Sequence, residues 1–276
     1  MSYACRKPAS ICKVLPDLER LTTPEEIAGF ADSEKRAIEQ RISALGLNLR
    51  LARRRDIPAI QEFQAQRFAK STLLEDGYVL YRTIRFGCAV VVENADGRIV
   101  GCNLCQSFDD ADRTIWGVRN SADPSVSGAN LAAEQARYTN LIGMLRGSCF
   151  RRGFFAPGNF GSASNLLNHV GVIAEALDHD VPGHEGPRFV LVLPLTPAGV
   201  QNNQIDIKKL LSFMEMHRAG HDFSTIAASD SQGLADMYAN SPFRVAAFLK
   251  AGRGVAENTF FALPEDVLGL PAAQAW

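Results

Sequence analysis

The sequence has no long run of apolar residues, few cysteines for its length and almost no net charge, and each absence excludes a class of protein. No stretch of about 18 apolar residues occurs, so no transmembrane helix is expected. Six cysteines in 276 residues are too few for a disulfide scaffold. Twenty-nine basic and thirty acidic residues leave a formal net charge of −1. The chain therefore has no overall electrostatic field that would attract it to nucleic acid or to a membrane surface.

What is present is typical of a globular protein. The hydrophobic content of 46% with 21% charged residues is enough for a sizeable core. The segment 1–16 has a basic character but lacks the continuous apolar core of a signal peptide. Reduced thiols and a cytoplasmic location are therefore expected. The one local cluster of charge, Arg50 with Arg53, Arg54 and Arg55, is expected to be a solvated corner between a strand and a helix.

Residues 1–46 are expected to form a helical extension. Thr23 is a suitable N-cap, Pro24 follows at the first helical position, and Glu25 and Glu26 complement the positive end of a helix. The pattern predicts a helix over Thr23–Ala44. Its apolar stripe is loose, which is typical of a helix on the surface of a larger body.

Residues 47–199 alternate between strand and helix patterns, which indicates the α/β class. The turn sequence Asn94–Gly97 predicts a hairpin between the apolar run Gly87–Glu93 and a returning strand, Arg98–Phe108. A glycine- and serine-containing loop, Asn120–Ala129, then enters a predicted helix, Leu131–Leu145. The other predicted elements are the strand Leu47–Ala52, the helix Asp56–Phe68, strands near Thr114–Val118 and Phe154–Ala156, the helix Ser162–Gly171, and the strands Val172–Leu177 and Phe189–Leu195.

Residues 200–276 continue with the same kinds of pattern. They predict a helix at Ile205–Arg218, an apolar segment at Phe223–Ala228, a helix at Ser231–Asn240, and strands at Arg244–Lys250 and Thr259–Leu263. The order helix, strand, helix, strand, strand is predicted for residues 131–195 and again for 205–263, so a second, half-length repeat is left open. The expected domains are a helical extension (1–46), a main α/β domain (47–199) and a C-terminal α/β extension (200–276).

The segment Pro124–Ala132, Pro-Ser-Val-Ser-Gly-Ala-Asn-Leu-Ala, resembles the donor loop of GNAT-type N-acyltransferases. In that family a strand leads through a glycine-rich loop into a helix, and unpaired N–H groups there hold the pyrophosphate of the acyl donor. The family loop reads Gln/Arg-x-x-Gly-x-Gly/Ala. Those positions are Ser127, Asn130 and Ala132 here, and Ala132 alone matches. The hairpin 91–101 and the opening 49–60 are also similar to the family's first strands and helix.

The resemblance implies a fold, a donor and a donor site. The fold is a GNAT-like mixed, twisted sheet flanked by helices, and the donor is an acyl-CoA. The implied donor-binding residues are Val118, Arg119, Ser127, Gly128, Ala129, Asn130 and Ala132. Ser127 departs from the family pattern, so a thioester on an acyl carrier protein remains an alternative donor to acyl-CoA. Such a thioester has a single phosphate in place of the pyrophosphate.

The implied reaction is attack of a small-molecule amine on the thioester carbonyl, through a tetrahedral oxyanion. It needs a base for the amine and an acid for the departing thiolate. Tyr238 matches the position at which the family often has a tyrosine acid. Glu134, one turn into the predicted helix after the loop, and Glu93, on the hairpin, are the candidate bases. A half-buried structural tyrosine and two surface carboxylates are the competing interpretations.

The cysteines suggest two alternatives, a zinc site and a cysteine nucleophile. Cys102 and Cys105, with His217 and His221, have the spacings of zinc ligands. Strand alternation would point the two thiols to opposite faces, so no metal is expected. Cys149 has no His–Asp partner at a recognisable spacing and is not expected to be a nucleophile. The arginines on either side of it are left open as ligands for a donor phosphate or an acidic substrate: Arg146, Arg151 and Arg152.

The sequence therefore predicts an acyltransferase that uses acyl-CoA or an acyl carrier protein and acts on the amine of a small molecule. Neither nucleic acid nor membrane is an expected partner, and an oligomer is left open. The alternative is a non-catalytic or regulatory module that has kept the fold and lost the donor site, since fold resemblance does not establish activity. A ligase that uses another activated donor, such as an aminoacyl ester, is the third interpretation.

Overall fold

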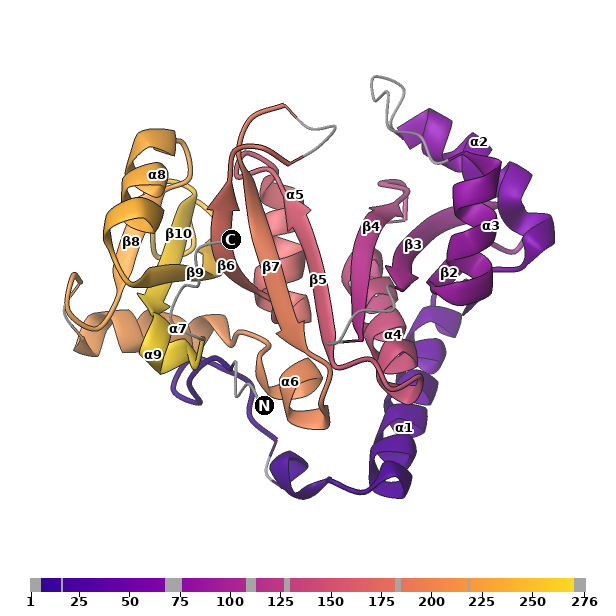
Figure 1. Ribbon diagram of the computed structural model, residues 1–276, viewed down its shortest axis with the longest axis horizontal. Coiled ribbons are helices and arrows are strands. Elements are labelled where there is room, and N and C mark those ends of the chain that lie inside the picture. Colours follow the sequence, from indigo (N-terminus) through magenta and orange to yellow (C-terminus); the bar gives the residue numbers. More distant parts are fainter. Residues whose placement is uncertain are drawn as a thin grey trace. The chain divides into compact units, whose positions relative to one another are not determined.

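The computed structural model describes residues 6–15, 17–67, 76–107, 113–126, 130–181, 185–217 and 219–270, and Figure 1 shows their elements. Helices and strands alternate along the chain, which confirms the α/β class. Two compact units are present, Leu21–Arg152 and Met1–Arg20 with Gly153–Trp276. The expected domain boundaries stay predictions. Among the described residues, no helix is both long and apolar enough to cross a membrane.

The unit Leu21–Arg152 contains four antiparallel strands that lie side by side in chain order. They are β1 (Asn48–Leu51), β2 (Cys88–Glu93), β3 (Ile99–Ser107) and β4 (Thr114–Ala122). The predicted hairpin is β2–β3. The Asn94 side-chain oxygen accepts hydrogen bonds from the backbone N–H groups of Asp96 and Arg98, and Gly97 has a φ of +76° that favours glycine in this turn.

Helices α2 (Ile57–Arg67) and α3 (Gly77–Phe86) cover one face of these strands. Leu80 of α3 is fully buried against them. The core on this face comprises Ala52, Ile60, Phe63, Leu80, Ala89, Val91, Ile99, Cys102 and Leu104. A short 3-10 turn, η2 (Arg54–Asp56), precedes α2.

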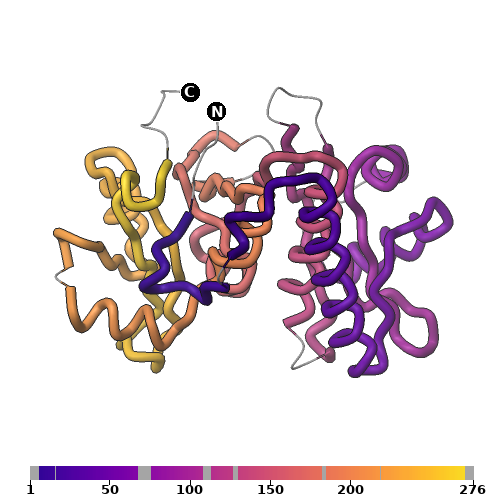
Figure 2. The backbone as a smooth tube through the Cα atoms, turned by 90° about the horizontal axis from the view of Figure 1, so that it is seen from below, coloured from indigo at the N-terminus to yellow at the C-terminus, as the bar shows by residue number. Residues whose placement is uncertain are grey.

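Helix α4 (Leu131–Leu145) packs on the opposite face, and α1 (Pro24–Ser43) packs on α4. Figure 2 shows α1 running alongside α4. The Thr23 hydroxyl accepts a hydrogen bond from the Glu26 backbone N–H, and the Glu26 carboxylate accepts one from the Thr23 N–H in return. This capping box satisfies amide groups that the first helical turn leaves unpaired, and it explains where α1 begins.

The other compact unit contains five strands in the order β7-β6-β9-β10-β8, and each neighbouring pair is antiparallel. They are β6 (Ile173–Asp178), β7 (Arg188–Pro194), β8 (Ser224–Ala227), β9 (Phe243–Leu249) and β10 (Thr259–Pro264). The helices are η1 (Leu18–Arg20), α5 (Phe160–Ala163), the π-helix Ser164–Val170, α6 (Pro197–Asn202), α7 (Ile207–Met216), α8 (Ser231–Asn240) and α9 (Glu265–Leu268). Strand β5 (Phe150–Phe155) contains the division between the units.

The predicted order of elements for residues 47–195 is confirmed, with differences in detail. Helix α3 was not predicted. Strand β4 continues to Ala122, so the residues from Asn120 that were expected in a loop are paired with β3. The helix predicted at Ser162–Gly171 is a short α-helix followed by a π-helix.

Candidate functional site

Strand β4 is irregular at the position where the sequence predicts donor contacts. Leu104 of β3 pairs with Arg119, whereas the next residue, Cys105, pairs with Gly117, so Val118 is an extra residue in β4. Such a β-bulge re-aims side chains and leaves one residue outside the ladder, and bulges are common beside active sites. Val118 and Arg119 are both half-buried.

The chain leaves β4 through a turn that its own side chains hold. The Asp123 carboxylate accepts hydrogen bonds from the backbone N–H and the hydroxyl of Ser125, at 2.9 and 2.7 Å. The bond from the Ser125 backbone is the main reason why the pKa of Asp123 lies below its ordinary value. The predicted donor residues Ser127, Gly128 and Ala129 lie outside the described residues.

Asn130 forms the entrance to α4 in an unusual conformation. Its φ of 49° and ψ of 36° lie in the left-handed region, which asparagine tolerates better than most residues. Its side chain makes no capping hydrogen bond to the helix. The first N–H groups of a helix have no acceptor within the helix, and the helix dipole favours negative charge there. Ala132, in this first turn, is half-buried.

Two amides hold β4 against the first turns of α4. The Asn120 side chain donates to the Ala132 carbonyl oxygen at 2.9 Å, and the Gln135 side chain donates to the Ser121 carbonyl oxygen at 3.3 Å. Asn120 Oδ1 and Gln135 Oε1 are buried and have no hydrogen-bond partner among the described residues. Asn120 and Gln135 therefore fix the position of the first turns of α4 against β4. Neither residue was predicted from the sequence to belong to the site.

Arg151 is buried beneath β4. Its guanidinium donates to the Ala136 carbonyl, the Thr139 hydroxyl and the Asn140 side-chain oxygen at 2.7–3.2 Å. A Cβ on Gly117 would lie 2.9 Å from this guanidinium, so the absence of a side chain at Gly117 makes room for the arginine. These three partners are neutral oxygens of α4, which makes Arg151 an internal support for the helix.

Glu134, a predicted base, is engaged in ion pairs. Its carboxylate accepts two hydrogen bonds from Arg41 of α1, at 3.0 and 3.1 Å, and lies 3.4 Å from Arg137. Arg137 also pairs with Glu34 of α1 at 3.3 Å. This network joins the N-terminal helix to α4, which gives Glu134 a structural role in the described state.

Tyr238, the predicted acid, lies on α8 in the other compact unit. Its hydroxyl donates to the Ala174 carbonyl oxygen of β6 at 2.8 Å and accepts from the Val245 backbone N–H of β9 at 3.2 Å. Ala174 and Val245 are paired residues of these two strands, so the hydroxyl links the strands where they meet. Burial is the main cause of a pKa well above the ordinary value for tyrosine.

Glu93, the second candidate base, belongs to a charge cluster. Arg50 pairs with both Glu93 and Asp56, and its bonds to Asp56 are 2.6 and 3.0 Å long. The hydrogen bond from Arg50 is the main reason why the pKa of Glu93 lies below its ordinary value. Arg50 is therefore not part of a solvated corner, although Arg54 and Arg55 are exposed.

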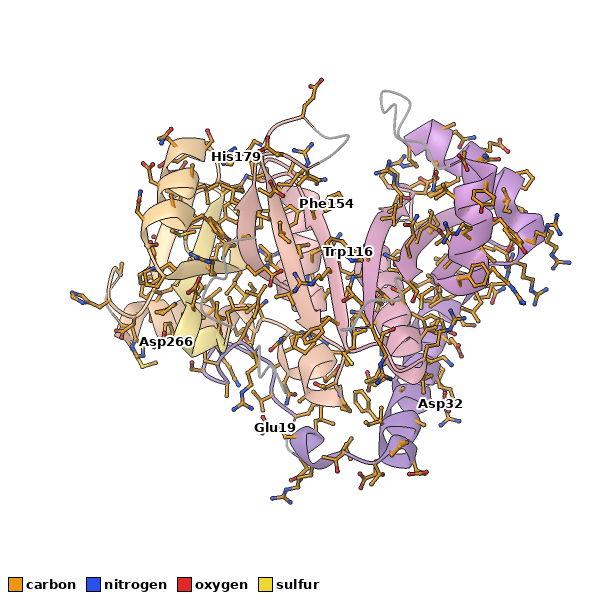
Figure 3. The ribbon with its side chains drawn as sticks, in the orientation of Figure 1. Glu19, Asp32, Trp116, Phe154, His179 and Asp266 are labelled. Atoms are coloured by element: carbon orange, nitrogen blue, oxygen red, sulfur yellow. The ribbon has the colours of Figure 1, made fainter. Side chains whose placement is uncertain are left out.

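The structure brings Val118, Arg119, Asn130 and Ala132 together at one junction between a strand and a helix, and Figure 3 shows Trp116 on the same strand. Cys102 and Cys105 are buried in β3, with their sulfur atoms near Ser121 and Asn103 respectively. Burial raises the pKa of the Cys102 thiol to about 11. His217 is near Asp222 instead, at 3.2 Å.

No family model and no curated protein matches the chain. Solved structures overlap about half of it. The ribosomal-protein-S5-alanine acetyltransferase from Vibrio fischeri is 13% identical, with 53% of this chain and 92% of that chain covered and a TM-score of 0.45. RimJ of Mycobacterium smegmatis, in complex with CoA-disulfide, is 19% identical, with 60% and 88% covered and a TM-score of 0.45. An acetyltransferase of the GNAT family from Streptococcus pneumoniae is 11% identical, with 54% and 99% covered and a TM-score of 0.45.

Proposed function

We propose that the chain is an N-acyltransferase that moves an acyl group from acyl-CoA to the amine of a small molecule. The observation that carries the proposal is the junction of β4 and α4. A bulge interrupts β4 at Val118, and the chain then enters α4 through a left-handed Asn130 whose side chain does not cap the helix. Uncapped amides at a helix entrance are a suitable site for the donor's phosphates.

In this proposal the thioester carbonyl lies against the bulge of β4. A backbone N–H at Val118, outside the regular ladder with β3, would donate to the oxyanion that forms when the amine attacks. The amine loses its proton to a base, and the thiolate leaves with a proton from an acid. Arg119, next to the bulge, and Ala132, in the first turn of α4, complete the proposed donor site.

Tyr238 and Glu134 are proposed as acid and base, and their present contacts also favour a second function. Tyr238 would have to release the backbone groups of Ala174 and Val245, and Glu134 would have to release Arg41. A regulatory module that binds the donor without turnover needs neither release. This alternative predicts ligand binding without product.

Substitution of Ala132 tests the donor site. The helix dipole stabilises a carboxylate in the first turn of a helix, but this carboxylate repels a phosphate bound there. Ala132→Asp should therefore leave the stability of the fold unchanged or slightly higher, and it should weaken donor binding. Ala132→Asn is the matched neutral control of the same shape. The measurement is the melting temperature with and without acetyl-CoA and CoA, because a ligand at about 100 times its Kd stabilises the folded state by about 2.7 kcal/mol.

A shift in the wild type and in Ala132→Asn that is absent in Ala132→Asp supports the proposed site. Release of free CoA in the presence of amines then separates the enzyme from the non-catalytic module. An equal shift of the melting temperature in all three proteins would show that the donor binds away from the start of α4. No shift with either ligand in folded wild-type protein would contradict acyl-CoA as the donor.

A further inference from the structure

The strand register shows on which face of the sheet each side chain of β4 lies. Directly paired residues of antiparallel strands have their side chains on the same face. Leu104 and Cys102 of β3 belong to the core that packs against α2 and α3, and we call this side of the sheet the α2 face. Their partners in β4, Arg119 and Ser121, therefore point to the α2 face as well. The distance of 3.5 Å between Cys102 Sγ and Ser121 Oγ agrees with this assignment.

The opposite face of β4, toward α4, is filled by side chains. A Cβ on Gly117 would lie 2.9 Å from the guanidinium of Arg151, which occupies that space. The Asn120 side chain donates to the Ala132 carbonyl oxygen of α4 at 2.9 Å. A second substrate that approached the bulge at Val118 from this side would meet packed side chains. We therefore expect the amine to approach the bulge from the α2 face.

Two large side chains of the α2 face lie on either side of the bulge. Trp116 pairs with Gln106, two residues beyond Leu104, so Trp116 points to the same face as Arg119. Neighbouring positions on one face of a strand are about 7 Å apart, because each residue adds about 3.3 Å. Trp116 and Arg119 are both half-buried, whereas Leu104 is 1% exposed. Part of each of these two side chains is therefore within reach of a small molecule.

The charge on the α2 face of β4 is positive. Arg119 is the only charged residue in the sequences of strands β3 and β4. Hydrogen bonds from Ser125 are the main cause of the low pKa of Asp123, at the end of β4. The positive charges of Arg67, at the end of α2, and of Arg98, in the hairpin turn, lower this pKa further. A guanidinium can hold a carboxylate by two parallel hydrogen bonds, so this face favours a substrate with a carboxylate.

We propose that the acceptor is an apolar amino acid, whose carboxylate is held by the Arg119 guanidinium and whose side chain packs on Trp116. The inference rests on the proposed acyl transfer and names the class of its acceptor. The amine and the carboxylate of an α-amino acid are attached to one carbon atom. A carboxylate on Arg119 therefore leaves the amine beside the adjacent residue Val118, where the thioester carbonyl lies in the proposed donor site. The backbone of Arg119 adjoins the donor, and its side chain binds the acceptor on the α2 face.

The reaction that follows is balanced without a further reactant. The amine nitrogen attacks the thioester carbonyl, the N–C bond forms and the C–S bond breaks. The amine loses one proton and the departing thiolate gains one. The products are free CoA and an N-acyl amino acid, whose carboxylate keeps its contact with Arg119 until release.

The test compares an amino acid with its amide, which keeps the amine and the side chain but has no carboxylate. Turnover of acetyl-CoA with phenylalanine and with phenylalaninamide gives one ratio of kcat/KM values for each protein. Comparing this ratio between proteins cancels the different basicity of the two amines. Arg119→Gln should lower the preference for phenylalanine at least about tenfold, because it removes charge-assisted hydrogen bonds. Arg119→Lys keeps the charge but not the planar fork, and its effect should be intermediate.

Two further variants separate charge from packing. Arg36→Gln is the control, because Arg36 is an exposed arginine of the same compact unit, and it should leave the ratio unchanged. Trp116→Ala should raise KM for phenylalanine and for its amide alike, because the lost contact is with the side chain that both share. The melting temperature of each variant shows whether it folds, and Arg119→Lys carries the test if Arg119→Gln does not.

An unchanged ratio in a folded Arg119 variant would overturn the inference, and so would equal kcat/KM values for phenylalanine and phenethylamine in the wild type. If Arg119→Gln weakens CoA binding and leaves the ratio unchanged, Arg119 is a ligand of the donor and the acyltransferase proposal survives. If no amine yields product, the acyltransferase proposal fails, and binding then tests the acceptor. With CoA present, phenylalanine should raise the melting temperature more than its amide does, and Arg119→Gln should abolish this difference. Equal shifts in the wild type would overturn the inference.

Discussion

Replacement of Arg50 by methionine should destabilise the unit Leu21–Arg152 by about 3 kcal/mol at neutral pH. Arg50 bridges Asp56, at the start of α2, and Glu93, at the end of β2. The side chains of Arg50, Asp56 and Glu93 are 18%, 9% and 19% exposed. Methionine keeps much of the volume and leaves two poorly solvated carboxylates without their cation. The expected loss is at the lower end of the range for a broken buried ion pair, because some solvent reaches the cluster.

The same variant should change the pH dependence of stability. Burial opposes the charged form of Asp56, but hydrogen bonds from the Arg50 side chain and the Arg53 backbone prevail and hold its pKa below the ordinary value. The pKa of Glu93 is also lowered, mainly by Arg50. A lowered folded-state pKa contributes stability above the unfolded pKa of roughly 4, and this contribution is lost as the pH falls through the folded value. The cost of Arg50→Met should therefore shrink at acidic pH.

Tryptophan fluorescence during urea unfolding measures the loss of stability in the compact unit that contains Arg50. The chain has two tryptophans, Trp116 on β4 and Trp276. A Trp276→Phe background leaves Trp116 as the reporter for the unit that contains Arg50. Arg36→Met is the control, because Arg36 is an exposed residue of the same unit and has no ion pair among the described residues. A loss at pH 7 below about 0.5 kcal/mol, the range of an ordinary surface substitution, would refute the reasoning. An equal loss at pH 7 and at pH 3.5 would refute it as well.

Three further substitutions test local features, each by its melting temperature. Thr23→Ala removes the capping box of α1 and should cost about 1 kcal/mol, while Thr23→Ser should restore most of it. Gly87→Ala should prevent normal folding, because its Cβ would lie 2.2 Å from the Cys105 carbonyl oxygen; a stable variant would contradict the described backbone. Tyr238→Phe leaves the Val245 N–H unpaired and should cost about 1–3 kcal/mol; unchanged turnover in that folded variant would exclude Tyr238 as the acid.

The sequence predicted elements whose boundaries depend on nearby residues. The predicted helices Leu131–Leu145 and Ser231–Asn240 have the bounds of α4 and α8. The start of α1 follows from the Thr23 cap, and the hairpin from the Asn94–Gly97 turn, since these interactions span a few residues. Periodicity also predicted the α/β class and the order of elements from residue 47 to 195.

The sequence signals of helix α3 were overlooked: Asp76 caps its start, and Leu80 and Thr83 form its buried side. The end of β4 was missed for a different reason. Arg119, Asn120 and Ser121 are polar, and pairing with β3 makes them a strand. Local propensity is a weak signal where a tertiary partner supplies the hydrogen bonds.

By itself, the sequence determined the composition of the candidate site, a short polar loop between a strand and a long helix. The tertiary structure alone decided which of its side chains are engaged. Glu134 pairs with Arg41, far away in the sequence, and the Tyr238 hydroxyl bonds to strands β6 and β9. Such contacts join residues that no local pattern relates, because they arise only when separate elements pack together. The left-handed Asn130 and the bulge at Val118 are likewise set by the pairing of whole strands and the docking of α4.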